Sequence, residues 1–552
     1  MSKKRSTIIF AVISAVFVFL TVRLCYLQVF LGKSLSTAAS TQRSFSTKVE
    51  KPRGEIVDRN LIPLTDRSVK ASIVLEPLFL RGKKDDINRI CEILKLDSDK
   101  VEKEINFKRE PLILDADEEA GSSILSLGIQ GVSVINMTER YDENSVARHI
   151  LGYINQVDQI GSAGIEKAYE DVLKIEGENS VNVITDAKDN LVEGIGYRLV
   201  KDGYYGKKLN VKLTLDYHIQ KIVESVMEKN NVTGAVVVED VINGDIAAIA
   251  SKPDFIQKKV GDYLESPKKE LFNRAVASYN IGSIFKIVSL TKALEEGIPL
   301  REDYFCSGSV TIGNRIFKCS SYDKGGHGLI GLNNAFALSC NTYFIELGLK
   351  VGYADLIDMA EKFGLGSPTG LKSQGIDESA GAMPSLNTYY TDGDVANLAI
   401  GQGSIMATPV QIADMVATVA NGGIKNQVNI VDSLIGENGS KLKDLKVAGG
   451  KRIMSKQTSD KVRELMEAVT TDGTGVKANS PDYGGAGGKT GSAETGQYID
   501  GEKVVHAWFA GYFPRVNPKY SISVFIENGK SGGEAAAPLF KEIAEEISKK
   551  KY

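Results

Sequence analysis

The stretch Gly234–Ser251, GAVVVEDVINGDIAAIAS, decides the fold of the larger part of this chain. Two apolar runs, Gly234–Glu239 and Asp245–Ser251, flank the dipeptide Asn243-Gly244. Runs of this composition favour strands, and Asn-Gly indicates a hairpin because both residues tolerate the positive φ angles of a type I′ turn. The stretch therefore predicts two antiparallel strands joined by such a turn.

The flanking segments extend this prediction. Before the hairpin, the alternation over Leu209–Leu215 predicts a strand, and Asp216 is expected to cap a helix over His218–Lys229. After it, residues 280–471 show mainly helical periodicity, as in Leu290–Glu296, Asn334–Val351, Leu356–Phe363 and Pro409–Ala420. Strands are expected again over Gly488–Thr495, Val504–Phe513 and Tyr520–Glu527, before a helical tail over Ala536–Lys551. This order predicts one antiparallel sheet with a helical insert, and a site between the two.

Length and charge limit the remaining possibilities. A chain of 552 residues is expected to form two or three domains. Its 67 basic and 70 acidic residues are intermixed and give a formal charge of -3. Nucleic-acid binding requires a basic stripe, so we exclude it.

The N-terminus predicts a membrane anchor. Lys3, Lys4 and Arg5 precede a largely apolar segment, residues 7–31, in which Arg23 is the one charged residue. About 20 apolar residues span a bilayer, and an arginine near the end of the span can reach the interface. The basic cluster places residues 1–6 in the cytoplasm and the rest of the chain outside the cell membrane. A signal peptide cleaved near Ser36-Thr37-Ala38 is the alternative.

Three short motifs carry the chemistry: Ser283-Ile284-Phe285-Lys286, Ser339-Cys340-Asn341 and Lys489-Thr490-Gly491. Each alone is weak, since Ser266 also has a lysine three residues later and Lys530-Ser531-Gly532 imitates the third motif. Their positions distinguish them, because the first two fall in the predicted insert and the third on a returning strand. Together they predict one composite site.

The first motif places a base beside a nucleophile. Ser283 opens an apolar helical stretch, with Lys286 one turn along on the same face. A serine hydroxyl attacks poorly unless a neighbour removes its proton, and a partly desolvated lysine can do so. The alternative is an N-capping serine with a solvated lysine.

The other two motifs would complete the site. Lys489 and Thr490 offer a cation and a hydroxyl to a substrate carboxylate, and Gly491 lets a peptide approach the strand. The backbone N–H groups of Ser492 and Ser283 would form an oxyanion hole. Ser339 would relay a proton and Asn341 would hold a substrate amide. The alternatives are an ordinary glycine-rich edge strand and a helix cap.

In this order the motifs resemble those of the penicillin-binding protein and serine β-lactamase superfamily. Further segments resemble transpeptidase domains: Gly401-Gln402-Gly403, Thr408-Pro409 and His506–Gly511. Others resemble the pedestal domain of class B members: Arg53–Asn60, Gly152-Tyr153-Ile154 and Gly164-Ile165-Glu166. The resemblance implies an α+β multidomain protein: a transmembrane helix over residues 7–31, a mixed α/β pedestal (dimerisation-type) domain over 40–206, and a transpeptidase domain over 209–552 with an antiparallel sheet and a helical subdomain.

The resemblance also implies a function. It implies a monofunctional D,D-transpeptidase of the elongation or sporulation type, which cross-links peptidoglycan stem peptides through a serine acyl-enzyme and is inhibited by β-lactams. It implies no cofactor for catalysis, and a SEDS-family glycosyltransferase as partner in the membrane. Ser492 departs from the commoner threonine. The alternatives are a β-lactamase or D,D-carboxypeptidase, and a β-lactam sensor or idle scaffold.

A second cluster concerns metal. Cys306, Cys319, His327 and Cys340 form the pattern C-x12-C-x7-H-x12-C, a Cys3His set that suits tetrahedral structural zinc. A Cys306–Cys319 disulfide is the alternative, and spacing alone favours it slightly. Some elongation-type class B proteins hold zinc beside the second motif, so the resemblance favours the metal.

Overall fold

The computed structural model describes residues 3–32, 44–50, 53–108, 111–155, 158–184, 197–205, 208–387, 389–499 and 501–550. The chain forms two compact units, each built from separate stretches. Unit 1 comprises Met1–Arg53, Ser68–Glu139 and Ile175–Lys207, and unit 2 comprises Gly54–Arg67, Arg140–Lys174 and Lys208–Tyr552. Residues 40 and 206, the expected ends of the pedestal domain, and the alternative cleavage site at Ser36–Ala38 lie outside the described residues.

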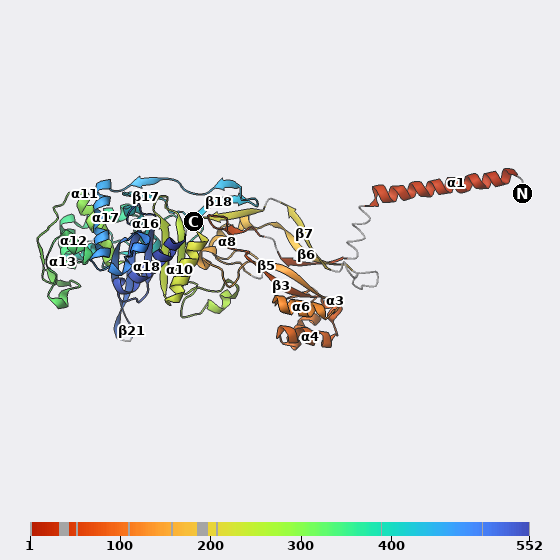
Figure 1. Cartoon of the computed structure of the whole chain (residues 1–552), viewed down its shortest axis with the longest axis horizontal. Coiled ribbons are helices and arrows are strands. Elements are labelled where there is room, and N and C mark those ends of the chain that lie inside the picture. The colour runs from red at the N-terminus through yellow and green to blue at the C-terminus, as the bar shows by residue number, and fades with distance from the viewer. Residues whose placement is uncertain are drawn as a thin grey trace. The chain divides into compact units, whose positions relative to one another are not determined.

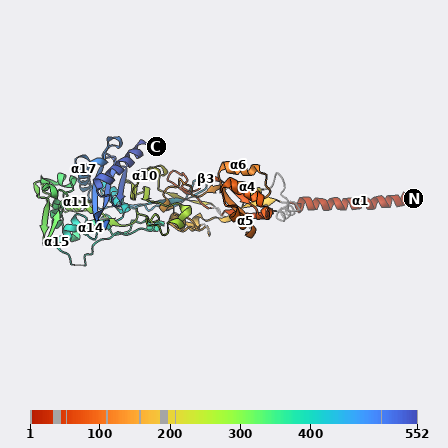
Figure 2. The same cartoon turned by 90° about the horizontal axis from the view of Figure 1, so that it is seen from below.

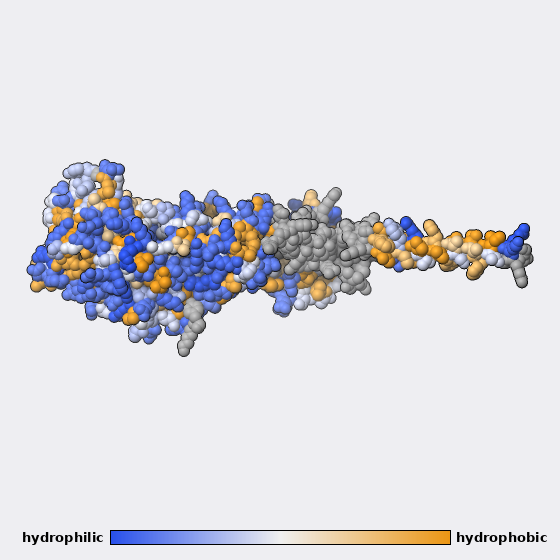
Figure 3. Space-filling view, turned by 90° about the horizontal axis from the view of Figure 1, so that it is seen from above, coloured by the Kyte–Doolittle hydropathy of each residue, from blue (hydrophilic) through white to orange (hydrophobic). Residues whose placement is uncertain are grey.

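Unit 1 begins with the apolar helix. Helix α1 runs from Lys3 to Cys25 and continues as a π-helix over Tyr26–Phe30. The segment Thr7–Phe30 is long and apolar enough to cross a membrane, and none of it is buried. Figure 3 shows apolar side chains along this helix. Such exposure would be unfavourable in water, so the helix fits a single-pass anchor.

Unit 1 also contains two antiparallel sheets. One has the order β1-β6-β7, with bounds Ser44–Glu50, Glu176–Ile184 and Tyr197–Tyr205. The other has the order β4-β3-β5, with bounds Leu112–Ala116, Ser68–Leu75 and Val132–Glu139. Helices α4 (Lys84–Leu94), α5 (Ser98–Phe107) and α6 (Glu118–Ser126) pack with the second sheet around Ile73, Leu75 and Ile90 (Figure 2). Asp97 and Asp117 cap α5 and α6, which fixes where these helices begin.

In unit 2 the segment Gly54–Asn60, which carries most of the expected motif Arg53–Asn60, joins a four-stranded sheet, ordered β19-β18-β8-β2. Its strands are β19 (Lys441–Asp444), β18 (Val431–Gly436), β8 (Leu209–Leu213) and β2 (Ile56–Val57). The Asp58 carboxylate is fully buried and accepts hydrogen bonds from the backbone of Asn60, Ile62 and Tyr217. Asp58 therefore ties this segment to the start of helix α10 (Tyr217–Lys229), which Asp216 caps as predicted.

A second buried charge lies close to the same segment. The Arg140 guanidinium contacts the Glu166 carboxylate at 2.6 Å and donates to the Gly54 carbonyl at 3.1 Å. Glu166 is fully buried and also accepts from the Tyr141 hydroxyl at 2.7 Å. A buried carboxylate needs such partners. Arg140 thus connects Gly54 and Glu166, which belong to two of the expected pedestal motifs. The sequence analysis did not single out this arginine.

The large sheet of unit 2 has the strand order β10-β9-β23-β22-β21, all antiparallel, as the hairpin and the three later strands predict. Its strands are β9 (Gly234–Asp240), β10 (Ile246–Lys252), β21 (Gly487–Ile499), β22 (Glu502–Phe513) and β23 (Tyr520–Ile526). Val236 and Val238 pack with α10 and α18 (Ala537–Lys549) on one face (Figure 1). Val237 belongs to the core on the other face, which contains the helical insert.

The predicted type I′ turn is wrong. Gly244 has a φ of 74°, but Asn243 is not among the residues with positive φ. Asp240 and Asp245 close a longer loop, in which the Asn243 side chain accepts from the Asp245 N–H. The asparagine thus stabilises the loop through its side chain rather than by adopting a left-handed backbone.

The insert contains helices α11 (Lys286–Glu295), α12 (Leu332–Ala337), α13 (Asn341–Val351), α14 (Tyr353–Lys362), α15 (Asp392–Ala399), α16 (Pro409–Ala420) and α17 (Lys456–Thr471). The continuous helix expected over Asn334–Val351 is wrong, because the chain breaks between α12 and α13. Ser339 stands in this break with a φ of 59°, a left-handed conformation that few non-glycine residues adopt. The break falls on the second motif.

Candidate active site

Ser283 lies in a 3-10 turn, Gly282–Phe285, that leads directly into α11. Residues i and i+3 eclipse in such a turn, so Ser283 and Lys286 share one side. The Lys286 Nζ donates to the Ser283 Oγ at 3.1 Å. The structure thus brings the first motif together as predicted, although through a 3-10 turn rather than the first turn of an α-helix.

Glycines allow this turn to pack against neighbouring backbone. The Gly282 N–H donates to the Gly401 carbonyl at 3.1 Å, and a Cβ on Gly401 would overlap with the Gly282 carbonyl. A Cβ on Gly491 would lie 2.8 Å from the Ile281 carbonyl, and one on Gly282 would lie 2.8 Å from the Ser492 carbonyl. Strand β21 therefore passes Ser283 at backbone distance, with Gly401-Gln402-Gly403 on another side.

The second motif surrounds the lysine. Lys286 Nζ lies 2.8 Å from the Ser339 carbonyl, 3.1 Å from the Ser339 Oγ and 2.7 Å from the Asn341 Oδ1. The left-handed backbone of Ser339 lets its carbonyl and its hydroxyl face the same ammonium group. Burial lowers the pKa of Lys286 to about 8. The site therefore holds a lysine that can lose its proton near neutral pH.

The third motif reaches the same hydroxyl. Lys489 is fully buried, and its Nζ donates to the Ser339 Oγ at 2.9 Å. Burial, with the nearby Lys286 charge, lowers the pKa of Lys489 well below its usual value. Two lysines thus flank one hydroxyl, which makes Ser339 a possible proton path between them. The carboxylate-binding role of Lys489 stays a prediction, because its ammonium contacts Ser339.

Thr490 and Ser492 point to one face of β21, since they are two residues apart on a strand. Thr490 is buried and Ser492 is exposed. The Ser492 Oγ accepts from the Gly532 N–H at 3.2 Å. The decoy Lys530-Ser531-Gly532 therefore lies beside the third motif without sharing its arrangement.

Two contacts were not expected from the sequence. The Asn341 Nδ2 donates to the Lys318 carbonyl at 3.0 Å, so the last residue of strand β14 (Arg315–Lys318) touches the side chain expected to hold a substrate amide. Thr474, on the loop after α17, lies 2.6 Å from Thr490 through their hydroxyl oxygens. Both contacts join residues distant in sequence. The small residues of the run Asp472–Gly475 are the one sequence signal for the contact between Thr474 and Thr490.

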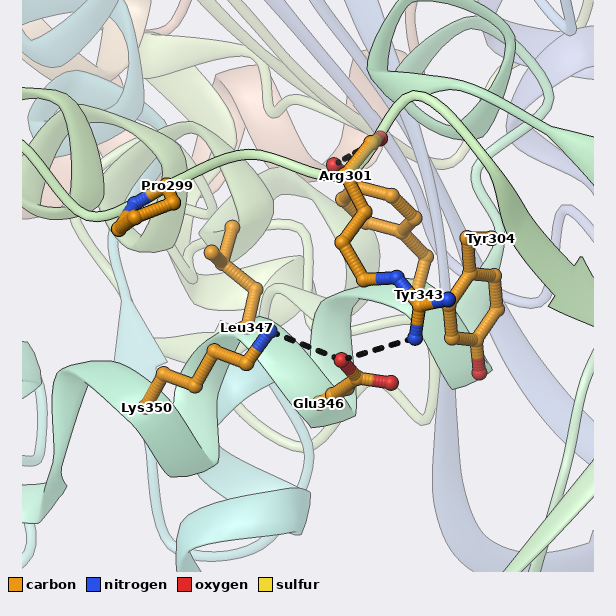
Figure 4. A pocket seen from close by; sticks show the side chains of 7 residues that line it. All are labelled: Pro299, Arg301, Tyr304, Tyr343, Glu346, Leu347 and Lys350. Carbon is orange, nitrogen blue, oxygen red and sulfur yellow. Dashed lines mark hydrogen bonds and ion pairs between the residues drawn. The ribbon is translucent and has the colours of Figure 1, made fainter.

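Helix α13 also lines a shallow pocket that contains no residue of the three motifs (Figure 4). Glu346 lies between Lys350, at 2.9 Å, and Arg301, at 3.5 Å. The Tyr343 hydroxyl donates to the Arg301 carbonyl at 3.0 Å. These contacts stabilise helix α13, which begins at Asn341. The residues that line the pocket therefore help to position the second motif.

The expected metal ligands also converge. One ligand atom each from Cys306, Cys319, His327 and Cys340 lies within 4.8 Å of the others. The His327 Nδ1 is 3.5 Å from both the Cys306 and the Cys319 sulfur, and the Cys319 and Cys340 sulfurs are 3.8 Å apart. All five cysteines of the chain, each within the described residues, are free thiols. Cys306, Cys319, His327 and Cys340 form a group that could hold a metal ion.

A serine beside a buried lysine, a second hydroxyl between two lysines, and a glycine-lined edge strand define the class of penicillin-recognising serine acyl-transfer enzymes. Comparisons with known proteins agree. Residues 234–545 match the penicillin-binding protein transpeptidase domain, and residues 48–211 match the penicillin-binding protein dimerisation domain. The chain belongs to the penicillin-binding proteins, and this pair of domains places it in class B.

Individual relatives cover nearly the whole chain. Stage V sporulation protein D of Bacillus subtilis is 31% identical over 98% of this chain and 85% of that protein. Peptidoglycan D,D-transpeptidase MrdA of Acinetobacter baumannii is 28% identical over 93% of this chain and 83% of that protein. The crystal structure of penicillin-binding protein 3 of Mycobacterium tuberculosis, complexed with aztreonam, superimposes with a TM-score of 0.62 at 25% identity, covering 91% of this chain and 96% of that one.

Proposed function

We propose that this protein is a peptidoglycan D,D-transpeptidase that forms an acyl-enzyme on Ser283, with Lys286 as the base. The observation that carries the proposal is the contact of the Lys286 Nζ with the Ser283 Oγ at 3.1 Å, in a lysine that is fully buried. Relatives named peptidoglycan D,D-transpeptidase, and a structural neighbour complexed with aztreonam, support the substrate and the inhibitor class.

In the acylation step the neutral Lys286 takes the Ser283 proton while the Oγ attacks the carbonyl carbon between two D-alanines. The Ser283 and Ser492 backbone N–H groups stabilise the resulting oxyanion, and the carbon–nitrogen bond then breaks. Ser339 lies 3.1 Å from Lys286 and 2.9 Å from Lys489 through its Oγ. It therefore passes a proton to the departing D-alanine amine.

In the transfer step an amine of a neighbouring stem peptide attacks the ester carbonyl. The amine proton returns to the Ser283 oxygen through Lys286, and the new peptide bond is the cross-link. Asn341, whose Oδ1 lies 2.7 Å from the Lys286 Nζ, keeps its amide nitrogen toward the Lys318 side of the site, where a substrate amide carbonyl can share it. Splitting acyl transfer into two steps explains why the site activates a serine.

Mass spectrometry after penicillin treatment tests the nucleophile. We expect one adduct per chain, on the peptide that contains Ser283, and none in the Ser283→Ala variant. Ser339→Ala is the matched control, because it keeps the nucleophile and removes only the relay, so its adduct should form slowly at the same position. An adduct on any other residue would refute the assignment.

We also propose that Thr7–Phe30 anchors the protein with its N-terminus in the cytoplasm and its catalytic unit outside. Lys4 and Arg5 before the apolar span support this orientation under the positive-inside rule. A cysteine-reactive, membrane-impermeant reagent tests it on an added C-terminal cysteine and an added N-terminal one in intact cells. Labelling only of the N-terminal cysteine would reverse the proposed orientation.

A SEDS-family glycosyltransferase is the proposed membrane partner, since neither matched domain is described as a strand-polymerising one. The anchor and the segment Arg53–Asn60 are the expected contacts. Co-purification in mild detergent tests this, with a variant whose anchor is replaced by an unrelated transmembrane helix as control. Equal recovery of the partner with both proteins would contradict a contact through the anchor.

Structural zinc is a further part of the proposal. The four ligand atoms lie within 4.8 Å of one another, a spacing that lets three thiolates and an imidazole bind one ion. Zinc bound by Cys306, Cys319, His327 and Cys340 would fix Cys340, which lies between the two polar residues of the second motif. It would not take part in acyl transfer.

Elemental analysis of purified protein tests the metal. We expect about one zinc per chain in the wild type, and loss of zinc with lower thermal stability in His327→Ala. Protein without zinc but with a Cys306–Cys319 disulfide would remove the metal from the proposal and leave the serine mechanism unchanged.

A further inference from the structure

The loop Asp472–Gly475, between α17 and the short 3-10 helix Val476–Ala478, touches the segment that leads into the second motif. The Thr474 N–H donates to the Ala337 carbonyl at 3.0 Å. A Cβ on Gly473 would overlap with the same carbonyl, so the loop can only lie this close because residue 473 is glycine. Ala337 ends α12, two residues before Ser339.

The same loop touches the third motif. The Thr474 Oγ1 lies 2.6 Å from the Thr490 Oγ1. Among the residues that the structure describes, the Thr490 hydroxyl has no other hydrogen-bond partner than Thr474. Thr490 is only 6% exposed, whereas Thr474 is exposed. Thr474 therefore connects the segment before the second motif with the strand of the third motif. It is an exposed residue that contacts the buried Thr490 hydroxyl.

The direction of this hydrogen bond decides what Thr490 can bind. A hydroxyl has one hydrogen to donate, and an ionised carboxylate can only accept. If Thr490 donated to Thr474, it would have no hydrogen left for a carboxylate. If Thr474 donates, the Thr490 hydrogen remains available. Carboxylate recognition by Thr490 thus requires Thr474 to be the donor.

Ser492 provides a parallel case on the same face of β21. Its Oγ accepts from the backbone N–H of Gly532 at 3.2 Å, a donor that cannot reverse its role. The Ser492 hydrogen is therefore also available to a ligand. The Ser492 hydroxyl thus has a partner that uses its oxygen and leaves its hydrogen unused, and the Thr490 hydroxyl matches it when Thr474 is the donor.

We propose that Thr474 is a positioning residue that donates to the Thr490 hydroxyl and so directs the Thr490 hydrogen toward the C-terminal carboxylate of the substrate or of a β-lactam. The inference rests on the proposed function, because it needs a substrate carboxylate bound beside Thr490. It goes beyond that function by assigning a role to a residue outside the three motifs.

The test compares two probes on full-length protein in detergent: benzylpenicillin, which has a free carboxylate, and its methyl ester, which does not. Thr474→Val keeps the shape of the side chain and removes the hydroxyl, and Thr474→Ser restores the hydroxyl. Thr471→Val is the matched control, because the Thr471 hydroxyl is exposed and its partners, the Glu467 and Ala468 carbonyls and the Asp472 carboxylate, all lie outside the three motifs. Rates of acylation are measured by mass spectrometry, and thermal unfolding is recorded for every variant.

We expect Thr474→Val to slow acylation by benzylpenicillin about fivefold, the effect of losing one hydrogen bond between two neutral hydroxyls, and to leave the ester within about twofold. Thr474→Ser and Thr471→Val should match the wild type with both probes. An equal loss with both probes would mean a merely structural role, and an unchanged benzylpenicillin rate would mean no role; either overturns the inference. Failure of the wild type to be acylated by benzylpenicillin would instead refute the proposed function.

Discussion

The lowered pKa of Lys286 predicts how acylation depends on pH. Only the neutral amine can take the Ser283 proton, so the rate should follow the neutral fraction of Lys286. With a pKa of about 8, roughly one tenth of the lysine is neutral at pH 7, half at pH 8 and nine tenths at pH 9. The rate constant should therefore rise about tenfold from pH 6 to 7, about fivefold from pH 7 to 8, and less than twofold from pH 8 to 9.

The sign follows from the cause. Burial disfavours the charged ammonium and lowers the pKa, so a falling pH protonates the base and slows the reaction. The assay is the second-order rate constant of acylation by a fluorescent penicillin between pH 6 and 10. Lys292→Arg is the control, because Lys292 lies on the same helix but is paired with Asp355 and Asp358. Its profile should match the wild type.

A flat profile between pH 6 and 9 would refute the reasoning, since it would mean that no group titrating near pH 8 limits acylation. A rise of about tenfold per pH unit that continues to pH 10 without levelling off would mean that Lys286 keeps its ordinary pKa despite its burial. The flat profile would remove Lys286 as the base, and the continuing rise would remove its lowered pKa.

Three further predictions concern separate features. Ser283→Ala should abolish penicillin acylation while lowering the free energy of unfolding by no more than about 1 kcal/mol, as thermal denaturation with labelling will show; Lys286→Ala should abolish it too. Gly401→Ala should destabilise the protein by about 2 kcal/mol or more and slow acylation, because position 401 has a φ of 73° and a Cβ there overlaps with the Gly282 carbonyl; denaturant unfolding measures this, and wild-type stability would contradict it. Purified membranes should contain the protein with Met1–Leu31 intact, and N-terminal sequencing that begins near Ala39 would show a cleaved signal peptide instead.

The sequence pattern predicted those helices, strands and caps that are determined by residues close together in the chain. The strands of the large sheet, the helices α11 and α16 and the Asp216 cap follow from periodicity and capping, which neighbouring residues specify. Ser283 and Lys286 of the first motif lie in contact as expected, because they are three positions apart in a single turn. The convergence of Cys306, Cys319, His327 and Cys340 was expected from the family resemblance, since their spacing alone slightly favoured a Cys306–Cys319 disulfide.

Features that depend on distant residues were not predictable from pattern. Asn334–Val351 has helical periodicity throughout, yet the break at Ser339 is held by Lys286 and Lys489 from elsewhere in the chain. The loop at Asn243-Gly244 also has a distant partner, because the Gly244 carbonyl accepts from the Asn429 N–H at 3.0 Å. Thr474 and the Lys318 carbonyl reach the site only through tertiary packing. Strand β2 likewise joins a sheet whose other strands come from beyond residue 208.

The glycine contacts around Ser283 bear on how antibiotic resistance could arise. Gly282, Gly401 and Gly491 each meet another backbone where a side chain would begin, so almost any replacement there disturbs the nucleophile before it affects the drug. Mutations that reject a β-lactam but keep the natural substrate are therefore expected away from these glycines. Ser492 and Thr474 are both exposed, but a change at Thr474 would weaken the natural substrate as well, because the carboxylate that it helps to bind is common to substrate and drug.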